Sequence, residues 1–290
     1  MTTIFNPKDL ENLYTPPPNS SGEDNGQVTI IGGSELFHGA PLLTVTIASR
    51  VVDMVFFTSP FKPLEKTTNE IKSKLFSFIW TPWNDVEKYI EKSDAVLIGP
   101  GMMRYGSSKF KMQSVKLDGT GKKTRRIVER LLHEYPHKKW VIDAGALQTM
   151  DADWIPKGSI ITPNKKEFKL LFGVEFNNFN LNEMEKMVEI MASKHECIIV
   201  LKGPITYISD GKETIRVEGG NAGLTKGGTG DVLAGLTVAL LAKNSPILAA
   251  TAASYTIKKA ADEMFAEVGT YYNADDVAKK IPEVLWKLII

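Results

Sequence analysis

The sequence predicts an α/β protein with a mainly parallel central sheet and helices on both faces. Short runs of β-branched and apolar residues alternate with helical segments along most of its 290 residues. Several of these runs end in glycine or an acidic residue, as strands do at the ligand-binding edge of such sheets. The sequence has no repeat of fixed period, and after residue 26 it has no strong linker. We therefore expect an N-terminal arm at residues 1–26 and one domain at residues 27–290.

The composition excludes several classes of protein. Lys and Arg number 35 and Asp and Glu 34, so the formal net charge of +1 argues against a dedicated nucleic-acid or membrane-surface binder. The longest apolar stretch, residues 232–242, has about eleven residues, whereas a membrane span needs roughly twenty. A single cysteine, Cys197, rules out an internal disulfide framework and fits a reducing compartment. We expect a cytoplasmic protein.

The first third of the chain begins irregularly and then becomes strand-rich. Three consecutive prolines predict an extended or irregular segment at residues 14–22. The β-branched run at residues 27–31, ended by two glycines, is typical of a buried strand. We then expect a buried helix at residues 40–50, a strand at 53–58 and irregular chain at 60–83.

The middle third alternates helices and strands. We expect a helix at residues 85–92, a strand at 95–98, a helix at 122–135 and a strand at 140–142. Residues 104–121 are rich in Gly, Ser and Lys and lack periodicity. A long loop of this kind in a compact domain is usually a lid or a mobile segment.

The last third predicts a strand at residues 159–161, followed by a helix with Thr162 as N-cap and Pro163 at its first position. Apolar residues at helical spacing follow over residues 181–191. The remaining elements are a buried strand at 197–201, a hairpin at 205–218 turning at Asp210-Gly211, and helices at 231–242, 246–265 and 275–288.

Five strand ends carry residues suited to ligand binding. Their sequences are Gly32-Gly33, Gly99-Pro100-Gly101, Asp143-Ala144-Gly145, Lys202-Gly203 and Gly227-Gly228-Thr229-Gly230-Asp231. A lone pair of glycines is more often a turn that requires positive φ. Five such junctions at one edge of a sheet are better explained by a ligand site.

The last junction is the strongest. Its glycines stand directly before an apolar helix, where free backbone N–H groups and the helix dipole together favour an anion. It has neither the Walker A pattern nor the dinucleotide pattern GxGxxG. Asp231 either complements the helix dipole or acts as a general base beside a phosphate.

Three further residues each have two readings. Lys202 could contact phosphate oxygens or be a solvated strand-end lysine. Asp143 could hold Mg²⁺ through water or cap a turn, and Glu167 has the same two readings.

Taken in order, these motifs resemble the ADP/ATP-dependent NAD(P)H-hydrate dehydratases of the ribokinase-like superfamily. The matching stretches are Ile31-Gly32-Gly33-Ser34, Gly39-Ala40-Pro41, Ile98-Gly99-Pro100-Gly101, Ile142-Asp143-Ala144, Thr162-Pro163-Asn164 with Glu167, Val200-Leu201-Lys202-Gly203 with Thr206, and residues 220–235. Within the last, Asn221-Ala222-Gly223 leading to Gly227-Gly228-Thr229-Gly230-Asp231 is the family-specific part. The resemblance covers about residues 27–288.

The resemblance implies a ribokinase-like three-layer α/β/α sandwich and a repair reaction. Hydrated NADH or NADPH is restored to NAD(P)H at the expense of ADP or ATP, with Mg²⁺. Asp231 would take the proton of the ring hydroxyl as a phosphoryl group arrives, and phosphate would then leave.

The resemblance also implies site residues. Ala40, Gly101, Asn164 and Asp231 match positions that bind the hydrate. Lys202, Gly203, Pro204, Ile205, Thr206 and Gly230 match nucleotide-binding positions, and Gly227, Gly228 and Thr229 complete the predicted phosphate cradle. The expected partners are a small-molecule substrate, further copies of the same chain and a separate hydrate epimerase, because the chain is too short to carry the epimerase domain fused to many relatives.

Three departures concern the substrate side of the site. Gly145 stands where the family often has Asp, and Met102-Met103 replace the usual Leu-Gly. Asn164 replaces a histidine, so that position can hydrogen-bond but cannot titrate near neutrality. Two alternatives stay open: a small-molecule kinase of the same superfamily acting on a vitamin precursor or sugar, and a nucleotide-binding regulator with a decayed site.

Overall fold

The structure, a computed structural model, describes residues 2–61, 75–105, 117–176 and 179–289. Its centre is a ten-stranded sheet in the order β1-β10-β9-β8-β7-β6-β5-β2-β3-β4. The strands are β1 (Thr2–Ile4), β2 (Gln27–Ile31), β3 (Met54–Thr58), β4 (Ile79–Trp80), β5 (Ala95–Ile98), β6 (Lys139–Ile142), β7 (Ile160–Ile161), β8 (Ile198–Leu201), β9 (Thr206–Ser209) and β10 (Thr214–Val217). Only β9 among them runs against the common direction.

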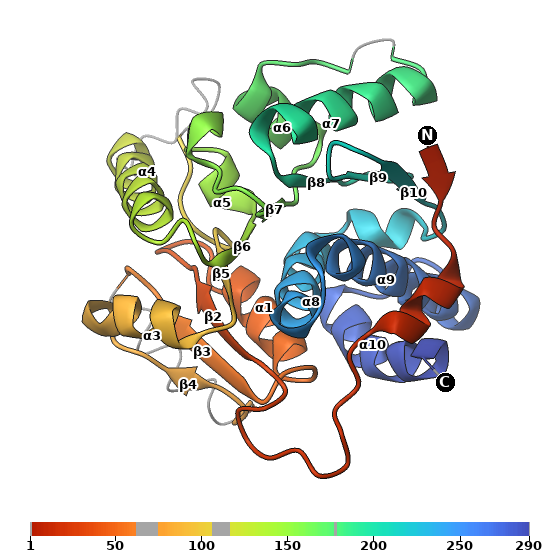
Figure 1. Cartoon of the computed structure of the whole chain (residues 1–290), viewed down its shortest axis with the longest axis horizontal. Helices are drawn as coiled ribbons and strands as arrows, with labels where there is room; N and C mark the ends of the chain where they lie inside the picture. The colour runs from red at the N-terminus through yellow and green to blue at the C-terminus, as the bar shows by residue number, and fades with distance from the viewer. Residues whose placement is uncertain (1, 62–74, 106–116, 177–178, 290) are drawn as a thin grey trace.

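Helices cover both faces of this sheet (Figure 1). One layer contains α1 (Gly39–Ala48), α8 (Thr229–Lys243), α9 (Pro246–Val268) and α10 (Ala274–Ile289). The other contains α3 (Val86–Lys92), α4 (Leu117–Glu134), α5 (Ala144–Leu147), α6 (Lys165–Phe172) and α7 (Leu181–His195). The predicted three-layer α/β/α sandwich is therefore confirmed. No helix of the described chain is long and apolar enough to span a bilayer.

Alternation along each strand divides the core between these layers. Leu97 and Val141 pack with the layer of α1 and α8, whereas Val96 and Ile142 pack with the layer of α4 and α6. Successive strand residues face opposite sides of a sheet. The continuous apolar runs of the sequence thus reflect strands that are covered on both faces.

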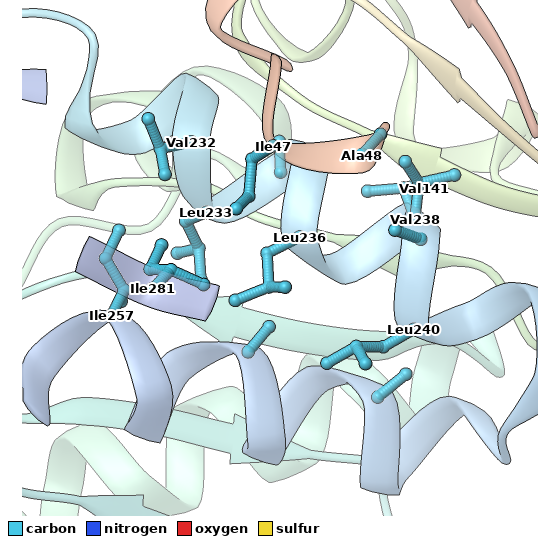
Figure 2. Packing of buried hydrophobic residues seen from close by; sticks show 14 of the residues in the cluster. Ile47, Ala48, Val141, Val232, Leu233, Leu236, Val238, Leu240, Ile257 and Ile281 are labelled. Carbon is cyan, nitrogen blue, oxygen red and sulfur yellow. The ribbon is translucent and has the colours of Figure 1, made fainter. Parts of the chain in front are cut away.

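Helix α8 is the centre of the first layer (Figure 2). Val232, Leu236 and Leu240 are buried among residues of α1, α9 and the sheet, so this helix has no polar face over most of its length. Gly235 permits a close approach of α1, because a Cβ at this position would lie 2.7 Å from Cα of Thr44. This packing anchors the N-terminus of α8 at the sheet edge.

The N-terminal segment contributes to the same core. β1 pairs with β10 in parallel, and the 3₁₀ helix η1 (Pro7–Asn12) follows it. Phe5, Leu10 and Leu13 are buried. Residues 14–22 contain no helix or strand, as predicted. The boundary at residue 26 stays a prediction.

The structure corrects three sequence expectations. α6 begins at Lys165 with Asn164 as its N-cap, so the prediction of Thr162 as cap and Pro163 at the first position was wrong. Those two residues follow β7 without entering a helix, and they still bond to the neighbouring strands: Thr162 N–H donates to the Ile142 carbonyl at 3.2 Å, and the Pro163 carbonyl accepts from Lys202 N–H at 2.9 Å. The stretch expected to be irregular contains the short strand β4. α4 begins at Leu117, and the rest of the predicted lid lies largely outside the described residues.

Candidate functional site

The carboxyl ends of β2 and β5 meet beside the start of α1. β3 extends the sheet to one side of this pair and β6 to the other, so this is the topological switch point of the fold. Gly33 N–H donates to the Pro100 carbonyl at 2.8 Å. A Cβ on Gly101, whose φ is +71°, would lie 2.8 Å from Cδ of Pro41. Gly101 and Ala40, which precedes Pro41, are therefore brought together, as expected.

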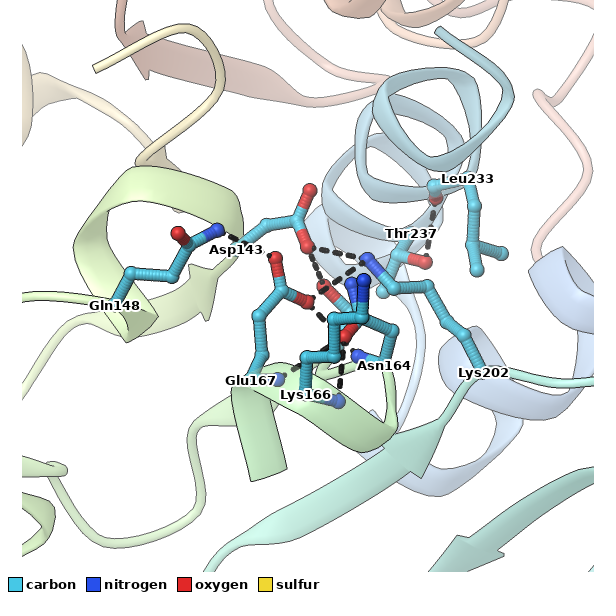
Figure 3. A network of polar contacts seen from close by, with 9 residues as sticks. Asp143, Gln148, Asn164, Lys166, Glu167, Lys202, Leu233 and Thr237 are labelled. Atoms are coloured by element: carbon cyan, nitrogen blue, oxygen red, sulfur yellow. Dashed lines mark hydrogen bonds and ion pairs between the residues drawn. The ribbon is translucent and has the colours of Figure 1, made fainter. Parts of the chain in front are cut away.

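A buried ionic cluster occupies the ends of β6, β7 and β8 (Figure 3). Nζ of Lys202 donates to Oδ1 of Asp143 at 2.8 Å and lies 3.7 Å from Oε2 of Glu167. Burial disfavours the charge of Lys202, but Asp143 and Glu167 outweigh this effect and raise its pKa above the usual value. The alternative of a solvated strand-end lysine is therefore wrong.

Asp143 is fixed by two donors. Besides Lys202, the hydroxyl of Thr162 donates to its Oδ1 at 2.7 Å, and the Asp143 side chain makes no capping hydrogen bond to α5. The next residue, Ala144, has φ of +47°, a conformation that costs a non-glycine residue free energy. Gly99 packs so closely that a Cβ there would lie 1.8 Å from the carbonyl oxygen of Asp143. The close packing and the two hydrogen bonds hold this carboxylate at the strand end despite the strain at Ala144.

Glu167 belongs to a capping box at the start of α6. Its Oε2 accepts from Asn164 N–H at 2.8 Å, while Oδ1 of Asn164 accepts from Glu167 N–H at 3.0 Å. Nε2 of Gln148 donates to Oε1 of Glu167 at 3.0 Å. Burial raises the pKa of Glu167, the negative charge of Asp143 adds to this effect, and Lys202 opposes it. The capping reading of Glu167 is confirmed.

The glycine-rich segment forms a tight turn into α8. Gly228 is the N-cap with φ of +96°, and Asp231 lies in the first turn. The hydroxyl of Thr229 donates to the carbonyls of Leu224 at 2.7 Å and Lys226 at 3.0 Å, which locks the turn. The first backbone N–H groups of an α-helix have no acceptor within the helix, so that of Gly230 is suited to an anion.

The ionic cluster and the start of α8 are adjacent. A Cβ on Gly230 would lie 3.5 Å from Nζ of Lys202. Burial, and after it the negative charge of Asp143, raise the pKa of Asp231, Lys202 opposes both, and the net pKa is about 7. The carboxyl of Asp231 is thus poised to exchange a proton near neutral pH.

The segment that precedes this turn is anchored by contacts that the sequence did not indicate. The hydroxyl of Tyr272 donates to Oδ1 of Asn221 at 2.6 Å, and Nδ2 of Asn221 donates to the Ala261 carbonyl at 2.9 Å. Nζ of Lys226 donates to the carbonyls of Tyr272 and Thr270. These contacts account for Asn221 in the motif, but no local pattern marks Tyr272.

The other predicted nucleotide positions form the exposed turn between β8 and β9. Gly203 and Pro204 are exposed, Ile205 is partly buried and Thr206 begins β9. Nζ of Lys258, a residue of α9 that sequence reasoning missed, donates to the carbonyls of both Gly203 and Pro204.

A mainly apolar pocket opens near the ends of β2 and β5. Gly33, Met102, Met103, Lys123 and Ile127 are among its lining residues. A Cβ on Gly145 would lie 2.2 Å from the carbonyl oxygen of Met102. The departures at Gly145 and at Met102-Met103 are therefore in contact.

Magnesium has two candidate carboxylates here. Mg²⁺ is commonly held by one or two carboxylates together with substrate phosphates and water. Asp143 and Glu167 fit that pattern, although each also interacts with Lys202. Within the described ranges, no group of three or more His, Cys, Asp or Glu residues is arranged to hold a metal ion.

Comparisons with known proteins bear on the family to which the chain belongs. The family model of NAD(P)H-hydrate dehydratase matches residues 28–283. A bifunctional NAD(P)H-hydrate repair enzyme of Methanocaldococcus jannaschii is 33% identical over 283 residues, which is 96% of this chain and 51% of that protein. An ADP-dependent (S)-NAD(P)H-hydrate dehydratase of Cenarchaeum symbiosum is 32% identical, covering 90% of this chain and 89% of its own length. The chain thus spans about half the length of the bifunctional relative.

Solved structures share the fold. The ADP/ATP-dependent NAD(P)H-hydrate dehydratase of Bacillus subtilis, co-crystallised with ATP and Mg²⁺, superposes with a TM-score of 0.76 at 20% identity, covering 99% of this chain and 98% of that one. A ribokinase-like superfamily protein of Enterococcus faecalis gives 0.79 at 20% identity, covering 99% and 96%. The family model matches most of the chain, and the Cenarchaeum symbiosum dehydratase is similar to it over 90% of its length. The chain belongs to the NAD(P)H-hydrate dehydratase family.

Proposed function

We propose that this chain converts hydrated NADH or NADPH back to NAD(P)H, with ADP or ATP as the phosphoryl donor. The observation that carries the proposal is Asp231. Its carboxyl has a pKa of about 7 and stands in the first turn of α8, directly after a glycine turn suited to phosphate. A general base works best when its pKa lies near the working pH.

Asp231 supplies the proton acceptor. Its carboxylate takes the proton of the ring hydroxyl while the hydroxyl oxygen bonds to the terminal phosphorus of the nucleotide, whose bridging P–O bond breaks. The lone pair of the ring nitrogen then expels phosphate as the C–O bond breaks. Loss of a proton from the neighbouring ring carbon leaves the double bond of NAD(P)H. The nucleotide leaves as AMP from ADP, or as ADP from ATP.

The start of α8 and Lys202 stabilise charge on the phosphoryl group. The N–H group of Gly230 and the positive end of the helix dipole stabilise the negative oxygens of the phosphoryl group during its transfer. Lys202 is pinned by Asp143 at 2.8 Å, so its charge stays beside Gly230 without reorganising. Asp143 and Glu167 are the residues that would hold Mg²⁺, which neutralises phosphate charge when bound.

The hydrate is proposed to bind on the side of Asp231 opposite the phosphoryl group. Ala40 and Gly101 present backbone with little side chain at the switch point, next to the apolar pocket. Oδ1 of Asn164 is engaged in the capping box. Its side-chain amide nitrogen is thus the group proposed to contact the substrate. At this position it can donate a hydrogen bond but cannot exchange a proton, which leaves acid–base work to Asp231.

The test is the recovery of reduced-nicotinamide absorbance from hydrated NADH and hydrated NADPH, with ADP and with ATP in separate runs. Recovery that depends on nucleotide supports the proposal. Absence of recovery with every combination, in a folded sample that binds ADP, would reject it. The kinase alternative has less support from the family and predicts nucleotide turnover on a vitamin precursor or sugar instead.

We also propose a cytoplasmic setting and small-molecule partners. The lone Cys197 is buried, and burial raises the pKa of its thiol to about 12, so it is protonated and unreactive at neutral pH. A homo-oligomer and a separate hydrate epimerase remain predictions from the family resemblance.

A further inference from the structure

Lys258 is a buried cation whose hydrogen bonds go to backbone carbonyls. It lies on α9 with 5% of its surface exposed. Its Nζ donates to the carbonyls of Pro204 at 2.6 Å, Gly219 at 3.0 Å and Gly203 at 3.3 Å. An ammonium carries three N–H bonds, so these three acceptors match its donors.

Burying the ammonium of Lys258 has a free-energy cost. Burial lowers the pKa of Lys258, and the charges of Asp262 and Glu218 offset this only in part. Its three hydrogen bonds fix the direction of the carbonyls that accept them. The contacts of Lys258 therefore point to a role in positioning backbone.

The backbone that Lys258 orients lies in the exposed turn after β8. In a trans peptide the C=O and the following N–H point in opposite directions, and the described chain has no cis peptide bonds. The carbonyl of Pro204 points inward to Lys258, so the N–H of Ile205 faces the opposite side. Proline has no N–H of its own, so Ile205 is the nearest donor that this contact orients.

The same helix holds the segment that leads to the phosphate turn. Oδ2 of Asp262, one helical turn after Lys258, accepts from Gly220 N–H at 3.1 Å. The carbonyl of Ala261 accepts from Nδ2 of Asn221 at 2.9 Å. Lys258 bonds to Gly219 in this segment and to Gly203 and Pro204 in the other. It thereby sets the spacing between the turn after β8 and the approach to Gly227.

We propose that Lys258 is a positioning residue for the nucleotide: its ammonium holds the Pro204–Ile205 peptide so that the Ile205 N–H is presented to a phosphate oxygen of ADP or ATP. This inference rests on the proposed nucleotide-dependent function. It does not involve proton transfer or the hydrate.

The experiment is calorimetric titration of ADP into the wild-type chain, the Lys258→Met variant and the Lys259→Met variant. Lys259 is the neighbouring exposed residue of α9, so Lys259→Met is the matched control. We expect Kd for ADP to rise by about tenfold or more in Lys258→Met, as for loss of a charge-assisted hydrogen bond, and to stay unchanged in the control. In turnover, KM for ADP should rise while kcat and the KM of the hydrate stay within about threefold.

An unchanged Kd for ADP in folded Lys258→Met would overturn the proposal, as would an equal rise in the control. If Lys258→Met does not fold, the Kd for ADP is measured for Lys258→Gln instead. The same rise is expected, because the neutral amide of Gln has fewer donors than the ammonium. The Kd for ADP does not depend on the dehydration reaction, because ADP binding is measured without the hydrate. A wild-type chain that binds ADP but restores no NAD(P)H would refute the proposed function and leave the test of Lys258 intact.

Discussion

Asp231→Asn is expected to impair catalysis and to stabilise the fold. The substitution keeps the shape of the side chain and removes both its charge and its ability to accept a proton. Loss of a general base lowers the rate by at least about a hundredfold. A carboxyl whose pKa is raised in the folded protein opposes folding once it is ionised, so its removal has the opposite effect on stability.

The size of this effect follows from the environment of Asp231. Its pKa moves from 3.8 to about 7 through burial and the charge of Asp143, with Lys202 opposing. At about 1.4 kcal/mol for each factor of ten, a fully retained shift corresponds to about 4 kcal/mol. The side chain is only partly buried, and solvent relaxation lowers the expectation to about 2 to 4 kcal/mol. In the wild type, ionisation of Asp231 does not reduce the free energy of unfolding at a pH below 3.8, the pKa of this carboxyl in the unfolded chain. The free energy of unfolding then falls as the pH rises through about 7, the pKa in the folded protein.

The assay is urea unfolding of both proteins across the range from about pH 5 to pH 8, beside turnover at neutral pH. The advantage of Asp231→Asn in free energy of unfolding should grow with pH and level off above about 7. Asp275→Asn is the matched control, because Asp275 is an exposed acid in the first turn of α10. The free energy of unfolding of Asp275→Asn should fall only by the helix-dipole contribution of about 0.3 to 1 kcal/mol. If Asp231→Asn behaves like the control and keeps its activity, Asp231 is a dipole cap and the reasoning is wrong.

Three further predictions test the surroundings of Asp231. The kcat/KM of the wild type should fall about tenfold per pH unit below about pH 7 and be level above it; a profile flat down to about pH 5 would exclude Asp231 as the base. Lys202→Met leaves Asp143 buried without its ammonium and should lower the free energy of unfolding by about 3 to 5 kcal/mol in urea, whereas a loss below about 1 kcal/mol would mean that the pair is not coupled. Gly228→Ala places a Cβ 2.5 Å from Cδ1 of Leu43 at a φ of +96°, so it should lower the free energy of unfolding by more than about 1 kcal/mol. Gly227→Ala places a Cβ with no atom within 4 Å, so it should change that free energy by no more than about 0.5 kcal/mol. Equal effects of the two variants in thermal unfolding would contradict the geometry of the turn.

Much of the fold could be predicted because its elements are encoded locally. The apolar run of α8 and the strands β2, β5 and β8 lie within a few residues of their predicted bounds. Elements defined by distant partners were missed. β1 exists because β10 offers it an edge, and β4 pairs with β3 through only two residues. The N-cap of α6 was predicted at the wrong residue because the hydroxyl of Thr162 donates to Asp143 instead of capping the helix. That contact joins residues 19 positions apart, and local capping rules do not include such pairs.

The site was predictable at its glycines and unpredictable in its ion pairs. Strand ends marked by glycine or acid meet at one sheet edge by topology, so Asp143, Lys202 and Asp231 could be placed near one another. That Lys202 pairs with Asp143, and that the pKa of Asp231 rises as a consequence of burial, depends on packing between strands β6 and β8 and helix α8. Lys258 and Tyr272 could not be found, because their hydrogen-bond partners lie about 40 or more residues away in the sequence and neither residue belongs to a motif.

The central claim, that dehydration proceeds through phosphorylation of the ring hydroxyl, is tested most directly by labelling that hydroxyl with heavy oxygen. After turnover with ADP, the released phosphate is analysed by mass spectrometry. We expect one labelled oxygen in the phosphate and none in the bulk water, because the C–O bond breaks only after the P–O bond has formed. Label recovered in water, with unlabelled phosphate, would contradict it.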